Sequence, residues 1–297
     1  MLSFSLGAIR MLMGEPNPQV RSTYRSGLFG AGLRGIEDSS SALRTLEMIA
    51  DKNFDLIVLD ADMEDSDIID MMKSLREKRI GPDPFTNIIL IADPPVADRA
   101  RRLVSAGADA VLVRPISVQL LQTRINQLIE SRRPFVVTQD YIGPERRTDQ
   151  RPGAMPIPAI PVPSSLRSRA FGKTDDNLHM QAVSETWDIV KRERITRLVY
   201  QIGWLANRIL PLGSKDDARE ARSQFIRQLG LVINSLDEWI SDTNNAEFYS
   251  AYRQLKEKVK ALTQAEGAPL LELINSICSD TARIEELWKR GAKAGPS

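Results

Sequence analysis

The sequence contains one cysteine and one histidine in 297 residues. A single cysteine excludes an intramolecular disulfide, and its neighbours Ile274 and Ile277 predict that Cys278 is a buried core residue. The single histidine, His179, argues against a zinc site or a histidine-based catalytic triad. Its setting, Asp-Asp-Asn-Leu-His-Met, predicts a solvated residue near a helix start rather than a phosphotransfer histidine. Zinc-dependent and triad-based enzymes are therefore disfavoured.

Long apolar runs and an excess of charge are also lacking. No uninterrupted apolar stretch reaches the roughly 18 residues that a membrane-spanning helix needs. Residues 1–13 are apolar, but they contain Arg10 and have no small-residue cleavage pattern, so a secretory signal is not expected. The net charge of +1 gives no general attraction to nucleic acid or to an anionic membrane. Together with the single cysteine, these features predict a cytoplasmic protein without a nucleic-acid or membrane partner.

Strand-like and helix-like segments alternate over residues 10–130. Short apolar runs predict strands at 10–13, 33–37, 55–60, 87–92 and 110–113. Amphipathic spacing predicts helices at 19–29, 39–52, 65–78, 95–106 and 117–130. This alternation is typical of the α/β class and predicts a doubly wound, five-stranded parallel sheet. Its strand ends would bring together Glu15, Asp60, Ala92 and Arg114 at one edge.

A carboxylate stands at the end of the most strongly apolar strand, Asp55-Leu-Ile-Val-Leu-Asp60. Four consecutive apolar residues suit a strand that is covered on both faces. Ligand sites in open α/β sheets lie beyond the carboxyl ends of such strands. Any chemistry is therefore expected at Asp60, and the alternative is an aspartate that only caps a turn.

Residues 9–130 resemble the receiver domains of two-component response regulators, as found in chemotaxis response regulators. The resemblance is carried by Glu15 with Asn17-Pro18, Asp55-Leu-Ile-Val-Leu-Asp60, Ala106-Gly-Ala-Asp109 and Arg114-Pro115. It implies a flavodoxin-like fold in which Asp60 accepts a phosphoryl group from a histidine kinase or phosphotransfer protein. It also implies a magnesium ion held by acids after the first strand, of which Glu15 is one, by Asp60, and by the backbone carbonyl of Asp62.

Several family positions differ in this chain. Pro16 replaces the second of two adjacent acids, Ala92 replaces a hydroxyl residue, and Val111 replaces an aromatic switch residue. Arg114 aligns with the family's lysine; it keeps the positive charge and can contact phosphate through its planar fork. Phosphoryl transfer to a carboxylate needs cations on the transferred group, so the loss of a metal ligand should slow the reaction.

Residues 133–173 are rich in proline and arginine and predict a linker. Its later part, Pro156-Ile-Pro-Ala-Ile-Pro-Val-Pro163, favours polyproline II or disorder. Its earlier part, residues 135–147, combines apolar, aromatic and basic residues, so it either docks on the preceding domain or binds a partner strand. We therefore expect three regions: a receiver-like domain at 1–132, the linker at 133–173 and a helical domain at 174–297.

The region 174–297 has four apolar stripes at helical spacing, which predict an all-α bundle. It has no phosphate loop, no recognition-helix motif and no paired carboxylates at a catalytic spacing, so neither an enzyme nor a DNA-binding output is predicted. Two functions remain open. One is a response regulator in which phosphorylated Asp60 controls a helical module that binds an unidentified protein or forms homo-oligomers. The alternative is a phosphorylation-independent pseudo-receiver that serves as a scaffold or adaptor.

Overall fold

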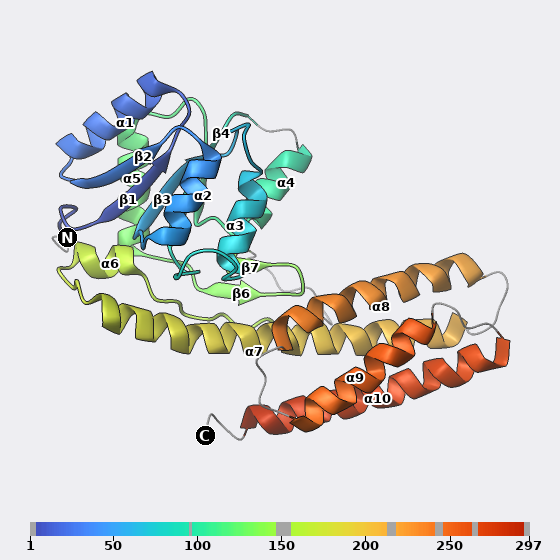
Figure 1. Cartoon of the computed structure of the whole chain (residues 1–297). Coiled ribbons are helices and arrows are strands. Elements are labelled where there is room, and N and C mark those ends of the chain that lie inside the picture. The colour runs from blue at the N-terminus through green and yellow to red at the C-terminus, as the bar shows by residue number, and fades with distance from the viewer. Residues whose placement is uncertain are drawn as a thin grey trace. The chain divides into compact units, whose positions relative to one another are not determined.

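The computed structural model describes residues 4–94, 97–146, 156–212, 218–240, 246–262 and 267–293 (Figure 1). The chain divides into two compact units, Met1–Trp187 and Asp188–Ser297. The predicted fold class is confirmed: a parallel sheet with flanking helices precedes a helical region. Within the described ranges, no helix combines the length and the apolar character that a membrane span requires.

The first unit is built on a five-stranded parallel sheet in the order β2-β1-β3-β4-β5. The strands are β1 Arg10–Gly14, β2 Gly35–Ser39, β3 Leu56–Asp60, β4 Asn87–Ala92 and β5 Ala110–Val113. All residues of β3 and β4 are buried, as their apolar runs predict. The chain order reverses between β1 and β3, so the residues that follow these two strands lie at the switch point where such sheets bind ligands.

Helices cover both faces of this sheet. They are α1 Pro18–Gly30, α2 Ala42–Asp51, α3 Ile68–Arg76, α4 Ala97–Ser105 and α5 Val118–Glu130. One apolar core includes Leu28 of α1 and Leu121 of α5, and the other includes Ile49 of α2 and Met72 of α3. The apolar stripes predicted from the sequence are therefore the faces that pack against the sheet.

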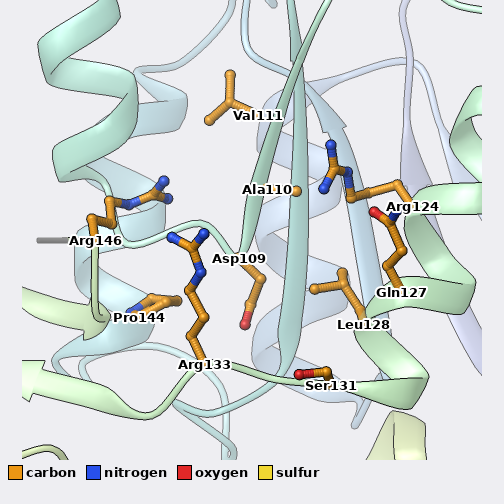
Figure 2. Close-up of a pocket in the computed structure, with 10 residues that line it drawn as sticks. All are labelled: Asp109, Ala110, Val111, Arg124, Gln127, Leu128, Ser131, Arg133, Pro144 and Arg146. Atoms are coloured by element: carbon orange, nitrogen blue, oxygen red, sulfur yellow. The ribbon is translucent and has the colours of Figure 1, made fainter. Parts of the chain in front are cut away.

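A hairpin and a short helix follow α5, in the region predicted to be a linker. The hairpin consists of β6 Phe135–Val137 and β7 Ile142–Pro144, and the helix is α6 Ser165–Ala170. Phe135 is fully buried, and its ring packs edge-on against Phe85 with a centroid separation of 5.7 Å. The end of the hairpin lies beside β5 and α5 (Figure 2). Leu166 of α6 is part of the same core as α1 and α5.

The region 133–173, expected to be a linker, makes contacts with the sheet domain. Its described residues pack on the sheet domain, and the first compact unit extends to Trp187. Ile160 of this region pairs with Phe135 through two backbone hydrogen bonds of 2.8 Å, an interaction between segments distant in sequence. Residues 147–155 lie outside the described residues. Where the boundaries of independently folding domains lie stays a prediction.

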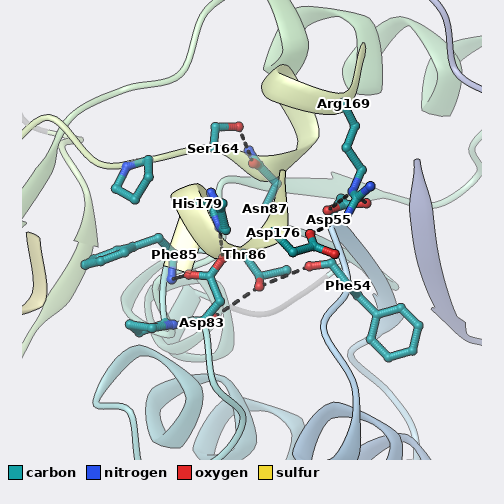
Figure 3. Close-up of polar contacts among 12 residues, drawn as sticks. Phe54, Asp55, Asp83, Phe85, Thr86, Asn87, Ser164, Arg169, Asp176 and His179 are labelled. Atoms are coloured by element: carbon teal, nitrogen blue, oxygen red, sulfur yellow. Dashed lines mark hydrogen bonds and ion pairs between the residues drawn. The ribbon is translucent and has the colours of Figure 1, made fainter. Parts of the chain in front are cut away.

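A polar network fixes the start of α7 Asp176–Ile209 against the amino-terminal edge of the sheet (Figure 3). The fully buried Asp55 accepts a hydrogen bond of 2.8 Å from the backbone N–H of Arg10 and pairs with the Arg169 Nε at 2.9 Å. Both arginines also contact Asp176. The His179 Nε2 lies 2.8 Å from the Asp83 Oδ2. The prediction of a solvated His179 was therefore wrong, although its place at a helix start is correct.

The second unit contains the later part of α7, α8 Arg219–Ile240, α9 Ala246–Leu262 and α10 Gly267–Lys293, with a short 3-10 turn, η1, at Leu210–Leu212. Specific contacts link these helices. The Tyr252 hydroxyl of α9 donates to the Ile233 carbonyl of α8 at 2.8 Å, and the Trp288 Nε1 of α10 donates to the Thr196 Oγ1 of α7 at 2.8 Å. Cys278 is half-buried, and burial raises the pKa of its thiol.

We expect Phe135→Ala to destabilise the first unit by about 3–5 kcal/mol, because the substitution empties a filled position in a core. Leu43→Ala is the matched control, because Leu43 is 55% exposed on α2. Chemical unfolding followed by circular dichroism would measure both. Equally small losses of stability in the two variants would mean that packing of the hairpin does not stabilise this unit.

Candidate functional site

Two carboxylates follow the neighbouring strands β1 and β3 at the switch point. Glu15 comes directly after β1 and is 3% exposed, and Asp60 ends β3 and is 5% exposed. Local backbone holds each one in place: the Glu15 Oε1 accepts the Asn17 N–H at 2.9 Å, and the Asp60 Oδ1 accepts the Asp62 N–H at 2.9 Å. Asn17 also caps α1 with its side chain. The sequence therefore predicted correctly that Glu15 and Asp60 share this edge.

Arg114 joins the two carboxylates. It follows β5, and its backbone N–H extends the ladder by donating to the Ala92 carbonyl at 2.9 Å. Its Nη2 lies 2.9 Å from the Asp60 Oδ2 and 3.1 Å from the Glu15 Oε2. Its Nη1 lies 3.3 Å from the Asp60 Oδ1. Both oxygens of Asp60 therefore face the same guanidinium.

Further charged groups surround this centre that the sequence analysis did not identify. The Arg114 Nη1 also lies 3.3 Å from the Asp93 Oδ1. Arg99 of α4 pairs with Asp62 and donates to the Ala61 carbonyl at 3.1 Å. No motif marks Arg99 or Asp93, because each reaches the site from a loop or helix whose position depends on the folded sheet.

Burial and charge set the protonation behaviour of the site. Burial raises the pKa of Glu15 above its ordinary value, and the negative charge of Asp60 raises it further, against opposing effects of the Asn17 N–H and Arg114. Burial alone lowers the pKa of Arg114, but its hydrogen bond to Asp60 and the charges of Asp60, Glu15 and Asp93 raise it overall. Arg114 is therefore a permanent cation between two buried acids.

The residues present do not fit the magnesium ion that receiver domains typically bind. A hard divalent cation needs carboxylate oxygens arranged around it. Here Arg114 already contacts the carboxylates of Glu15 and Asp60, and the position of the second acid is the exposed Pro16. Within the described ranges, no group of three or more His, Cys, Asp or Glu side chains is arranged to hold a metal ion. The Arg114 guanidinium lies between these two carboxylates.

The remaining family positions lie where the sequence predicted but offer altered chemistry. Ala92 ends β4 and is fully buried. An alanine side chain has no hydroxyl, so it cannot donate a hydrogen bond to a group on Asp60. Val111 lies on β5 and is half-buried. A side chain without an aromatic ring or polar group cannot reproduce the switch that the family resemblance implies.

We expect Arg114→Ala to lower the free energy of unfolding of the first unit by about 3 kcal/mol, because it leaves two buried carboxylates without their partner. The loss should shrink in an Asp60→Asn background, where one of the two charges is already gone. Arg101→Ala is the control, because Arg101 is 79% exposed beside Asp98. Chemical unfolding of the four variants and the wild type would measure the coupling. A loss as small as that of Arg101→Ala would contradict the ion-pair cluster.

The same substitution should raise the pKa of Glu15 further, because Arg114 lowers it in the intact protein. The unfolded chain releases this proton near the ordinary pKa of 4.5, whereas the folded protein retains it to higher pH. The free energy of unfolding therefore falls as the pH rises across that interval, and Arg114→Ala should widen the interval. Carbon-13 NMR titration of the Glu15 carboxyl group measures the shift directly; an unchanged pKa would contradict the contact.

Residues 12–126 match the family model of the response regulator receiver domain. Response regulator MprA of Mycobacterium leprae is 29% identical over 126 residues, which cover 42% of this chain and 53% of that protein. MprA of Mycobacterium tuberculosis strain H37Rv is 28% identical over 127 residues, which cover 43% of this chain and 53% of that protein. The chain thus spans about half the length of the curated relatives it matches.

Solved receiver structures also align with this part of the chain. A CheY-like receiver domain protein of Methanospirillum hungatei is 19% identical, with a TM-score of 0.37 and coverage of 40% of this chain and 91% of that chain. Chemotaxis response regulator CheY4 of Vibrio cholerae is 19% identical, with a TM-score of 0.36 and coverage of 40% and 98%. The family match, with the strand order β2-β1-β3-β4-β5, identifies residues 12–126 as a response regulator receiver domain of a two-component system.

Proposed function

We propose that this receiver domain works without phosphorylation, as a protein-docking module of a two-component signalling protein. The observation that carries the proposal is the contact of one guanidinium, that of Arg114, with both Asp60 and Glu15. The cluster holds the loops after β1, β3 and β5 in one arrangement. The domain then offers a fixed surface to its partner rather than one that changes when a phosphoryl group is added.

The chemistry of phosphoryl transfer supports this proposal. A carboxylate nucleophile needs an oxygen free to attack phosphorus, and the transferred group needs cations on its own oxygens. Arg114 meets both oxygens of Asp60, and Asp62 donates its N–H to one of them. The Arg114 guanidinium therefore contacts the nucleophile, Asp60, rather than the oxygens of a transferred group. Without a metal ion to replace it, transition-state stabilisation is poor and transfer is slow.

A second candidate is the phosphoacceptor function that the family resemblance implies. The position of Asp60 at the carboxyl end of β3 favours it, with the Arg114 guanidinium 2.9 Å from the Asp60 Oδ2 as a cation beside the carboxylate. A histidine kinase or phosphotransfer protein would then be the donor. Arg114 would have to leave Asp60 and bind the phosphoryl oxygens through its planar fork.

The helical region is proposed to bind a protein or to self-associate, without enzymatic activity. Apolar side chains on its surface favour this assignment: Leu231 of α8 is 69% exposed, and Tyr200 and Trp204 of α7 are 47% and 43% exposed. Large aromatic residues at a protein surface are typical of interaction sites. The chemical nature of the target stays open.

Treatment of the full-length protein with magnesium and a small phosphodonor tests the two candidates. We expect intact-mass analysis to find no phosphoryl group on the wild type or on Asp60→Asn. The double variant Pro16→Asp, Arg114→Lys is the positive control, because it restores an acid and a compact ammonium at the family positions. A phosphoryl group that appears on the wild type and is lost in Asp60→Asn would establish the phosphoacceptor function instead.

A further inference from the structure

A second site lies at the other end of β5 from Arg114. A hollow of about 270 Å³ is bordered by the start of β5, the second half of α5 and the end of β7 (Figure 2). It is lined by Asp109, Ala110, Val111, Arg124, Gln127, Leu128, Ser131, Arg133, Pro144 and Arg146. All of these residues belong to the first unit. The hollow shares no residue with the Glu15, Asp60 and Arg114 cluster.

Three arginines make this hollow strongly basic. Arg124 extends from α5, while Arg133 and Arg146 flank the hairpin on its two sides (Figure 2). Asp109 is the only carboxylate among the lining residues. Its Oδ1 pairs with the Arg132 Nε at 2.8 Å, and its Oδ2 pairs with the Arg76 Nη2 at 2.9 Å. The negative charge of Asp109 is thus balanced by two arginines outside the hollow.

Hydrogen-bond donors in the hollow are left without acceptors. The Nε atoms of Arg124 and Arg146 are buried and have no hydrogen-bond partner within the described part of the chain. The Arg133 Nη1 donates to the Glu145 carbonyl at a long 3.4 Å. A ligand is favoured not by these buried Nε atoms but by the terminal guanidinium N–H groups of the three arginines that line the hollow, which can donate to ligand oxygens.

The hairpin places Arg146 there through a close backbone approach. A Cβ at Gly143 would lie 2.9 Å from the Cα of Gly107. The two backbone segments can therefore approach this closely only because both residues are glycine. Gly107 also has a φ of +84°, which favours glycine. Arg146 then donates to the Ala108 carbonyl, directly after Gly107. The position of the Arg146 guanidinium is therefore built into the backbone.

We propose that this hollow binds a small phosphate-bearing anion with at least two negative charges. The planar fork of arginine matches phosphate oxygens in pairs, and three arginines can balance a multiply charged group. A volume of 270 Å³ is below the range of about 300–1,000 Å³ usual for larger ligands, which favours a compact anion. The ligand touches the hairpin, α5 and β5 together, so it braces the segment that follows the receiver domain.

Isothermal titration calorimetry of the full-length protein with pyrophosphate and with inorganic phosphate tests the proposal. We expect saturable binding, tighter for pyrophosphate, that weakens as the salt concentration rises. Arg124→Gln and Arg146→Gln should each weaken binding by about tenfold, since each removes a charge-assisted contact. Arg101→Gln is the matched control on an exposed surface and should leave affinity unchanged. Circular dichroism confirms that each variant is folded.

Succinate provides a comparison that carries two negative charges without phosphorus. We expect it to bind much more weakly than pyrophosphate. Absence of pyrophosphate binding to the wild type, or equal affinity in wild type, Arg124→Gln and Arg146→Gln, would overturn the site. Succinate binding as tight as that of pyrophosphate would overturn the assignment of phosphate as the recognised group. None of these outcomes depends on whether Asp60 is phosphorylated.

Discussion

Buried aspartates paired with arginines organise the first unit. A carboxylate removed from water is unfavourable unless a cation and hydrogen bonds replace the lost solvation. Asp55 lies before β3, Asp60 ends it, and Asp109 precedes β5, and all three side chains are almost fully buried. Each is met by at least one arginine from a distant part of the sequence. Loops, the hairpin and the helices after α5 are positioned by these pairs.

The pairs at the two ends of β3 have different consequences. At the amino end, Asp55 draws in Arg10 and Arg169 and so fixes α6 and the start of α7 to the sheet. At the carboxyl end, Asp60 draws in Arg114, which occupies the centre of the site where receivers bind their cation. The same kind of ion pair therefore fixes helices to the sheet at one edge and joins Asp60 to Arg114 at the other.

Burial of Arg76 shows how the hairpin becomes part of this unit. Its side chain is 1% exposed, and burial lowers the pKa of Arg76 to about 10 despite the opposing charge of Asp109. The guanidinium donates to the carbonyls of Gly107 and Thr86 and lies 5.1 Å from the ring centroid of Phe135. Packing of the hairpin shields these bonds from water, which strengthens them.

The sequence by itself determined the order of strands and helices, the parallel sheet and the shared edge of Glu15, Asp60 and Arg114. The order of the elements and the parallel sheet follow from apolar periodicity and from the alternation of strands with helices. The shared edge follows because each of these three residues lies at or directly after the end of a strand. Through the resemblance to receiver domains it also marked Pro16, Ala92 and Val111 as positions that differ from the family pattern.

Only the tertiary structure decided how these residues are used. Whether Arg114 faces a phosphate or the carboxylates depends on distances between β1, β3 and β5, which no local pattern encodes. The pairing of Ile160 with Phe135, the contact of His179 with Asp83 and the presence of three arginines in the lining of one hollow join residues far apart in the chain. Composition predicted a solvated histidine at His179. Burial depends on what the rest of the fold brings into contact, so composition alone does not determine it.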